Sequence, residues 1–165
     1  MNDRFREIPA RINQTVAILE ELSARIDHFE TETLPVLGRT NDAVLIPVQL
    51  IENGFTAVET LFVRISQAFE NNLDQHRWHT HLLEKMTLEI ADVRPRVISD
   101  RLYRNLAELM RFRHFKRYYF SLDYDWRKVD LLLQIFRESL PLLKEELYAF
   151  SKLVTASLTT ANDEE

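Results

Sequence analysis

The chain contains no cysteine, only two glycines and only five prolines among its 165 residues. The absence of cysteine excludes disulfides, thiolate catalysis and zinc sites built on cysteine. The scarcity of glycine argues against a sheet protein, which would need many tight turns. No run of about 18 apolar residues is present, as a membrane-spanning helix would require, so we expect no membrane partner. These absences predict a single helical domain that is stabilised by packing alone.

Signals for targeting and for cofactors are also missing from the sequence. The first nine residues, MNDRFREIP, have no apolar core of the signal-peptide type. Together with the lack of cysteine, this favours the reducing cytoplasm. Neither a glycine-rich phosphate loop nor a Gly-x-Ser-x-Gly elbow occurs, and we expect no cofactor.

Apolar residues recur along most of the chain at alternating steps of three and four, which places them on one stripe of a helix. The pattern predicts helices over about residues 6–30, 44–69, 78–90, 101–120 and 126–158. Helices that are apolar on one stripe and joined by short links pack side by side. The sequence therefore predicts an all-α fold, an up-and-down antiparallel bundle of about five helices.

A few residues mark where these helices should end or bend. We expect a break between Thr31 and Asp42, because proline, glycine and capping residues gather there. Gly54 lies in the middle of the second helix, and we expect another backbone to approach it closely. Pro141 should kink the last helix. The domain is predicted to span residues 1–158, followed by a frayed acidic tail over residues 159–165.

Charge is distributed unevenly along the chain. Residues 94–117 carry eight basic and two acidic side chains, a net charge of +6, whereas the segments before and after carry -7 and -4. Such local asymmetry is typical of a protein that binds phosphate groups. The alternative is equally open: the basic helix pairs with acidic neighbours in the fold or with an acidic partner protein.

The basic segment also holds aromatic rings and one imidazole. Arginine can clamp a phosphate with two hydrogen bonds, and aromatic rings can stack on unpaired bases, so RNA is a sensible ligand class. On a helix, Arg111, His114 and Tyr118 share one face, whereas Arg113 and Arg117 share another. The candidate site residues are Arg104, Arg111, Arg113, His114, Lys116, Arg117, Tyr118 and Tyr119.

A histidine cluster invites a metal interpretation, because His76 and His79 lie one turn apart and imidazole is a common zinc ligand. The segment also contains His81 and Glu84. Surface histidines are ordinary in a polar segment at a helix start, and the chain lacks the paired Glu-x-x-His motifs of a di-iron bundle. We therefore expect no metal site.

Four segments of the chain resemble HepT-like proteins of the HEPN superfamily. These segments are ENGFTAVETLF at 52–62, FRHFKRYYF at 112–120, DYDW at 123–126 and LPLLKEEL at 140–147. The resemblance implies a small helical domain that dimerises and is encoded with a nucleotidyltransferase partner in toxin-antitoxin pairs. Active members of the family cleave RNA without a metal, using an arginine, then a histidine a short gap later, and a tyrosine two residues after the histidine.

The resemblance assigns roles to individual residues and also shows where the motif is degraded. Arg113 matches the motif arginine, while Tyr118 stands at the histidine position and Phe120 at the tyrosine position. Metal-free cleavage needs a group that moves the proton of the 2'-hydroxyl near neutral pH, which imidazole does well and a phenol does poorly. The resemblance also implies that the partner attaches AMP to the motif tyrosine. Phe120 has no hydroxyl to modify, which leaves Tyr118 or Tyr119 as possible replacements.

Three functions follow from these observations. The first is a HepT-like protein that binds RNA, a nucleotidyltransferase or both, with weak or no ribonuclease activity, and candidate phosphate-binding residues Arg104, Arg111, Lys116, Arg117 and Tyr119. The second is a working nuclease in which Arg113, His114 and Tyr118 are rearranged. The third is a non-catalytic helical adaptor whose basic helix binds an acidic protein.

Overall fold

The computed structural model describes residues 3–69, 78–91, 93–118 and 122–163. Within these ranges the chain is all-α, apart from one isolated bridge between Ile90 and Arg94. The predicted bundle of about five helices is confirmed. The elements are α1 (Asp3–Arg6), α2 (Ile8–His28), the π-helical turn η1 (Phe29–Thr33), α3 (Leu34–Leu37), α4 (Leu45–Phe69), α5 (Trp78–Lys85), α6 (Asp100–Tyr118) and α7 (Trp126–Asp163).

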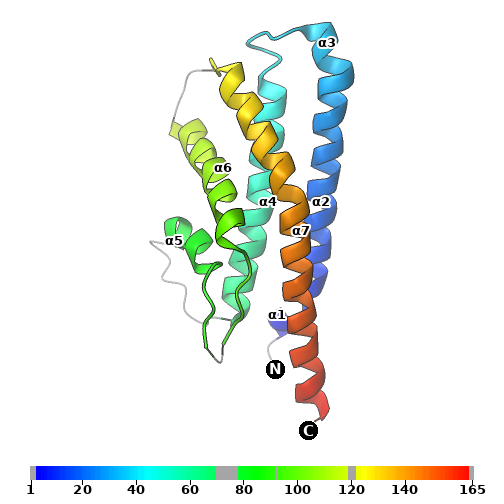
Figure 1. The fold of residues 1–165 in the computed structure, drawn as a ribbon, viewed down its shortest axis with the longest axis vertical. Coiled ribbons are helices and arrows are strands. Elements are labelled where there is room, and N and C mark those ends of the chain that lie inside the picture. The colour runs from blue at the N-terminus through cyan, green and yellow to red at the C-terminus, as the bar shows by residue number, and fades with distance from the viewer. Residues whose placement is uncertain (1–2, 70–77, 92, 119–121, 164–165) are drawn as a thin grey trace.

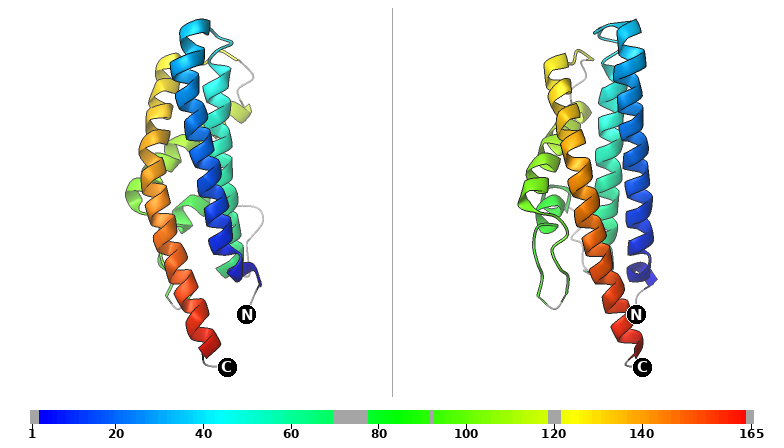
Figure 2. Two further views of the ribbon diagram at one scale, coloured as in Figure 1. Left: turned by 90° about the vertical axis from the view of Figure 1, so that its right-hand side faces the viewer. Right: turned by 45° about the vertical axis from the view of Figure 1, so that its right-hand side comes forward.

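The long helices run alternately up and down (Figure 1). One rod made of α2, η1 and α3 rises along the bundle, α4 descends, α6 rises again and α7 descends. Helix α2 contacts α4 and α7, and α6 contacts the same two helices from another side, while α5 packs against α4 and α6. The views in Figure 2 place α6 on the outside of the bundle. The described helices therefore leave one face of α6 uncovered.

The core consists of the stripes that the periodic pattern predicts. Ile12, Ile51, Leu102 and Leu147, one from each long helix, have no exposed surface. The apolar stripe of α7 is buried as far as Val154 by the other helices of the same chain. None of the described helices combines the length and the apolar content that a membrane crossing demands.

The first helical rod ends later than the sequence predicts. Instead of breaking at Thr31, it continues through η1 to Leu37 and ends at Gly38, whose φ of 68° suits a glycine. Proline has no N-H and crowds the carbonyl four residues before it. The π-turn, in which the N-H of Leu34 bonds to the carbonyl of Phe29, widens the helix just before Pro35 and lets the rod continue.

Helix α5 ends earlier than predicted, at Lys85 rather than Ile90. The cause is a buried arginine from the following segment, because Arg94 donates from Nη2 to the carbonyl of Lys85 at 2.9 Å. The next carbonyl, that of Met86, accepts the N-H groups of Val97 and Ile98 at 3.0 and 3.1 Å. These contacts fold the chain back on the helix end. The side chain of Trp78, the first residue of α5, lies outside the described part of the structure.

Gly54 is closely packed, but the expectation of a neighbouring backbone is wrong, because the neighbour is an aromatic ring. A Cβ atom at Gly54 would lie 2.4 Å from Cε2 of Phe136 on α7. Pro141 lies inside α7, which continues on both sides of it. The helix also extends past Thr159 to Asp163, through residues that the sequence assigns to a frayed tail.

Candidate functional site

The basic helix α6 is fixed at its N-terminal end by a cap that joins it to α7. The hydroxyl of Ser99 accepts the N-H of Leu102 at 3.2 Å, as a capping serine does. The N-H of Ser99 in turn donates to Glu146 of α7 at 2.7 Å. Because this end of the helix is fixed, the direction of each side chain further along α6 is set by the helical repeat of about 3.6 residues.

Arg113, the arginine of the motif, faces into the bundle. Its guanidinium forms an ion pair with Glu59 of α4, and the two side chains are only 13% and 14% exposed. The guanidinium carbon also lies 5.8 Å from the centroid of the Phe55 ring, within the range of a cation-π contact. Arg113 therefore joins α6 to α4 and presents little of its charge to solvent.

Lys116 lies one turn further along the same face and makes the same kind of contact. Its ammonium group pairs with Glu52 and donates to Gln49 at 3.0 Å, both on α4. Burial, and to a lesser degree the charge of Glu52, raises the pKa of the nearby Tyr124 phenol. We call Arg113 and Lys116 the inner cations. For these two residues the structure shows the second of the two interpretations of the basic segment, in which basic side chains pair with acidic neighbours in the fold.

Other arginines of α6 point away from the bundle. Arg101, Arg104 and Arg111 are exposed, and they share one helix face because they stand three and seven residues apart. We call these three the outer arginine row. Glu108 lies on the same face and pairs with Arg111. The row contains one residue, Arg101, that the sequence reading does not single out.

An aromatic ring and a lysine stand at the upper end of the outer face. Phe115 is 40% exposed, and the Nζ atom of Lys128, in the first turns of α7, lies 4.9 Å from its ring centroid. Lys128 is itself exposed. Four cationic side chains, the row and Lys128, thus accompany the carboxylate of Glu108 on this described surface, and Asp100, which pairs with Arg96, stands at its lower end.

The structure does not bring the proposed catalytic residues together on one described surface. Arg113 faces α4, whereas His114 is exposed. The last two residues of α6, Arg117 and Tyr118, are described by their backbone alone. Tyr119, like Phe120, lies outside the described residues. The catalytic assignment and the roles of these last residues stay predictions.

The histidine segment is only partly described. His76 lies outside the described residues, as does the side chain of His79, and His81 stands 3.6 Å from Glu84 on the surface. Across the described side chains, no three His, Cys, Asp or Glu residues are grouped as metal ligands would be.

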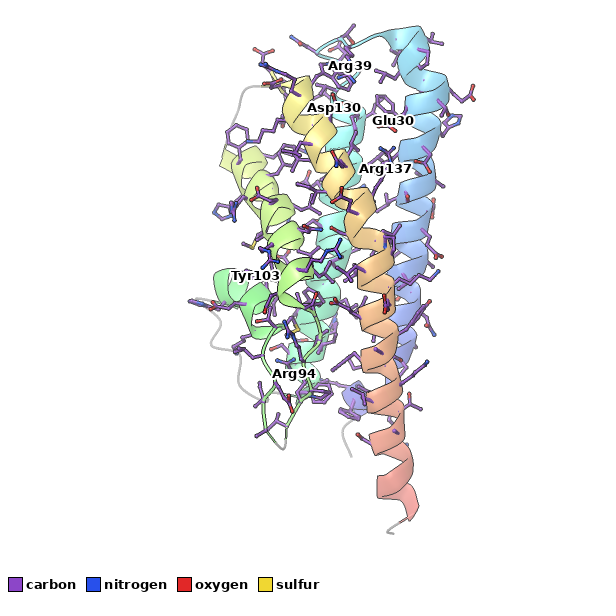
Figure 3. The ribbon with its side chains drawn as sticks, in the orientation of Figure 1. Glu30, Arg39, Arg94, Tyr103, Asp130 and Arg137 are labelled. Atoms are coloured by element: carbon purple, nitrogen blue, oxygen red, sulfur yellow. The ribbon has the colours of Figure 1, made fainter. Side chains whose placement is uncertain are left out.

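A second polar cluster, which sequence reasoning missed, joins the first helical rod to α7 (Figure 3). Arg137 of α7 pairs with Glu30 and with Asp27, the latter at 3.2 Å. Hydrogen bonding to Glu30 raises the pKa of Arg137. The cluster also contains a pair between Arg39 and Asp130, and hydrogen bonding to Asp130 raises the pKa of Arg39 in the same way. These partners stand about a hundred residues apart in sequence, so no local pattern announces them.

Around Arg39 the cluster includes an aromatic stack. The guanidinium bonds to both carboxylate oxygens of Asp130, at 2.7 and 3.2 Å, and lies 5.0 Å from the Trp126 ring centroid. Phe29 packs parallel to Trp126, with the ring centroids 6.5 Å apart. The indole N-H donates to the carbonyl of Thr40 at 3.2 Å. These contacts hold the segment between α3 and α4 against the start of α7.

Comparison with known proteins places the chain in a family. Residues 48–154 match the family described as HepT-like protein. Neither a curated protein nor a solved structure matches the chain. The matched region covers more than half of the sequence and runs from the start of α4 to near the end of α7, so it includes the inner cations and the outer row. The chain therefore belongs to the HepT-like protein family.

Proposed function

We propose that this chain is a component of a toxin-antitoxin-type system that binds RNA, a nucleotidyltransferase partner or both through α6, and has weak or no ribonuclease activity. The observation that carries the proposal is the state of Arg113. The motif arginine is paired with Glu59 and 13% exposed, and a tyrosine stands where the family has its histidine. A paired arginine without an imidazole at the histidine position cannot move the 2'-hydroxyl proton near neutral pH.

His114 does not restore the missing chemistry. Adjacent residues on a helix point about 100° apart, and Arg113 and His114 accordingly differ in burial, one facing α4 and the other exposed. A general base and a phosphate clamp must reach the same phosphodiester at hydrogen-bond distance. The described geometry therefore favours binding over cleavage.

Cleavage of total RNA and tRNA by the purified protein, with a chelator present, tests the proposal. The wild-type chain, Arg113→Ala and Tyr118→His are compared, each checked for helicity by circular dichroism. We expect no cleavage by the first two and a gain of cleavage in Tyr118→His, which restores the imidazole. Cleavage by the wild type that Arg113→Ala abolishes would instead establish a rearranged nuclease.

The partner is proposed to be a nucleotidyltransferase encoded beside this chain. The support is membership of the HepT-like family together with the tyrosines that end or follow α6. Co-expression of the two chains followed by size-exclusion chromatography tests the pairing, and intact mass measurement after incubation with ATP tests transfer of AMP. Substituting Tyr118 and Tyr119 by phenylalanine, singly and together, would locate the modified hydroxyl.

We propose further that the chain forms a homodimer. The apolar stripe of α7 offers little surface for a dimer contact, because it is already buried within the chain. The proposal rests on the resemblance to a family that dimerises and on Leu131 and Leu153, which are more than half exposed among the described side chains of α7. Sedimentation equilibrium of the wild type and of Leu131→Glu tests both the mass and the contact.

A further inference from the structure

We propose that RNA binds along the outer arginine row of α6, Arg101, Arg104 and Arg111, on the face opposite the motif arginine. The inference rests on the proposed RNA binding and specifies where the strand lies. It separates two tasks that the sequence assigns to one basic segment. The inner cations attach α6 to α4, and the outer row holds the ligand.

The first ground is which charges are available. Arg113 and Lys116 are at most 22% exposed, and each already faces a carboxylate of α4. A phosphate would have to displace that carboxylate and enter a crowded interface. Arg111, by contrast, is 65% exposed, and its partner Glu108 lies on the same open face. Exposed ion pairs of this kind contribute little energy, so a phosphate can replace the carboxylate at small cost.

The second ground is the geometry of the row. At a rise of about 1.5 Å per residue, Arg104 lies about 4.5 Å along the axis from Arg101, and Arg111 a further ~10.5 Å on. The row is thus a straight cationic line about 15 Å long on a helix that is capped and packed on three neighbours. Lys128 extends the line past Phe115 onto α7. A line of cations of this length can follow several consecutive phosphates of one strand.

The third ground is the lack of apolar surface on this face. Phe115 is the large apolar side chain that α6 exposes among its described residues. A protein partner normally needs an apolar interface core, and a membrane-surface helix needs an apolar face to insert. A ligand recognised here is recognised by charge, which is how proteins bind the nucleic-acid backbone. Phe115, beside Arg111 and Lys128, adds a ring on which an unpaired base can stack.

Binding of a fluorescently labelled single-stranded RNA of 20 nucleotides, followed by anisotropy from 50 to 300 mM KCl with EDTA present, tests the inference. The row variant is Arg101→Gln/Arg104→Gln/Arg111→Gln. Its matched control is Arg11→Gln/Arg25→Gln/Arg64→Gln, which removes three exposed arginines from α2 and α4. Lys116→Gln represents the inner face. Each variant is first followed through urea unfolding, and all are compared at a temperature where each is fully folded.

We expect the row variant to bind at least about tenfold more weakly than the control, and its salt slope to fall by about 2, since each phosphate contact on a single strand contributes about 0.7. Lys116→Gln should keep the wild-type slope. Glu108→Gln should bind more tightly than wild type, because it removes the carboxylate that competes for Arg111.

Three results would overturn the inference. If Lys116→Gln loses binding while the row variant keeps it, RNA uses the motif face, and the proposed function survives without this site. If polyglutamate displaces RNA as well as unlabelled RNA of the same charge does, the row is a docking site for acidic proteins. If the wild type does not bind RNA at 50 mM KCl, RNA binding fails in the proposed function as well.

Discussion

Ion pairs cross two of the interfaces between helices, which we call seams, and the pairs in the two seams differ in burial. Between α4 and α6, the pair of Arg113 with Glu59 is 13% and 14% exposed. Between the first rod and α7, the pair of Arg137 with Glu30 is 36% and 32% exposed, and Lys144 with Glu20 is more exposed still. The chemistry is the same in both seams, but water reaches the second far more easily.

The difference in burial decides what each pair does. In a water-poor seam a charge that loses its partner stays desolvated, so removing either partner is costly even where the intact pair adds little net stability. In a wet seam the freed charge is solvated again and little is lost. The motif arginine belongs to the first class. Its position therefore determines how α6 is attached, whatever its relation to RNA.

The largest effect is expected for Glu59→Ala. The substitution leaves the guanidinium of Arg113 without its carboxylate in a mostly buried site, and we expect a loss of about 2–3 kcal/mol, less than for a fully buried pair. Urea unfolding followed by circular dichroism measures it. The control is Glu108→Ala, which removes a carboxylate from the outer face of α6 and should change stability by less than about 0.5 kcal/mol.

A double variant sharpens this prediction. Glu59→Leu/Arg113→Met replaces the pair by apolar side chains of similar size and should recover most of the stability, because no unpaired charge is left. If Glu59→Ala costs no more than Glu108→Ala, the two seams do not differ as their burial implies. The role of Arg113 in attaching α6 would then be refuted.

A smaller loss, about 1 kcal/mol, is expected for Lys116→Met. Methionine keeps an apolar stem of similar length but leaves the carboxylate of Glu52, 21% exposed, without its cation. The urea midpoint should fall between those of Glu59→Ala and wild type. Glu52→Gln, which can still accept from Lys116, should cost less. An equal loss of stability in both variants would mean that the lost attraction between Lys116 and the carboxylate sets the cost. Leaving the Glu52 carboxylate charged without its cation would then add nothing.

In the wet seam, Arg137→Met is expected to cost only about 0.5–1 kcal/mol, although it removes contacts to two carboxylates. The difference between variant and wild type should shrink in 1 M NaCl, where the screening length falls to about 3 Å. The difference caused by Glu59→Ala should persist there. A salt-independent loss for Arg137→Met would place its pairs in the same class as those of Arg113.

Most of the fold could be predicted from the sequence because its determinants are local. The four-three stripes of α4 and α7 are visible within a few residues, and the structure bears them out. Ser99 and Asp125 are residue types that cap helices, and each accepts an N-H at the start of the helix that follows it. The end of α5 is predicted wrongly because a contact from the following segment decides it. Arg94 ends α5 by reaching the carbonyl of Lys85 from the other side of a turn, and nothing near Lys85 in the sequence signals it.

The candidate site was predictable in part. Leu102, Leu106 and Leu109 define the buried stripe of α6, and the next positions on that stripe are those of Arg113 and Lys116. Helical periodicity alone therefore indicates that these two cations face inward. Their partners are 54 and 64 residues away, on α4, and only the packing of the two helices identifies them.

The smallest effect is expected in alkaline solution, where the two seams titrate through different groups. Burial and then the charge of Glu52 raise the pKa of Tyr124, beside the α4–α6 seam, above its ordinary value of 10.0. A phenol that holds its proton longer in the folded state stabilises the fold below about pH 10, and this contribution is lost as the pH rises through the folded pKa. Stability measured by urea unfolding should therefore decline above pH 10, and Tyr124→Phe should decline less. In the seam between the first rod and α7, hydrogen bonding to Glu20 raises the pKa of Lys144. The stability that Lys144 contributes therefore also falls as the pH rises. Because Lys144 is solvated, Lys144→Met should flatten the decline less than Tyr124→Phe, and the reverse order would contradict the contrast between the seams.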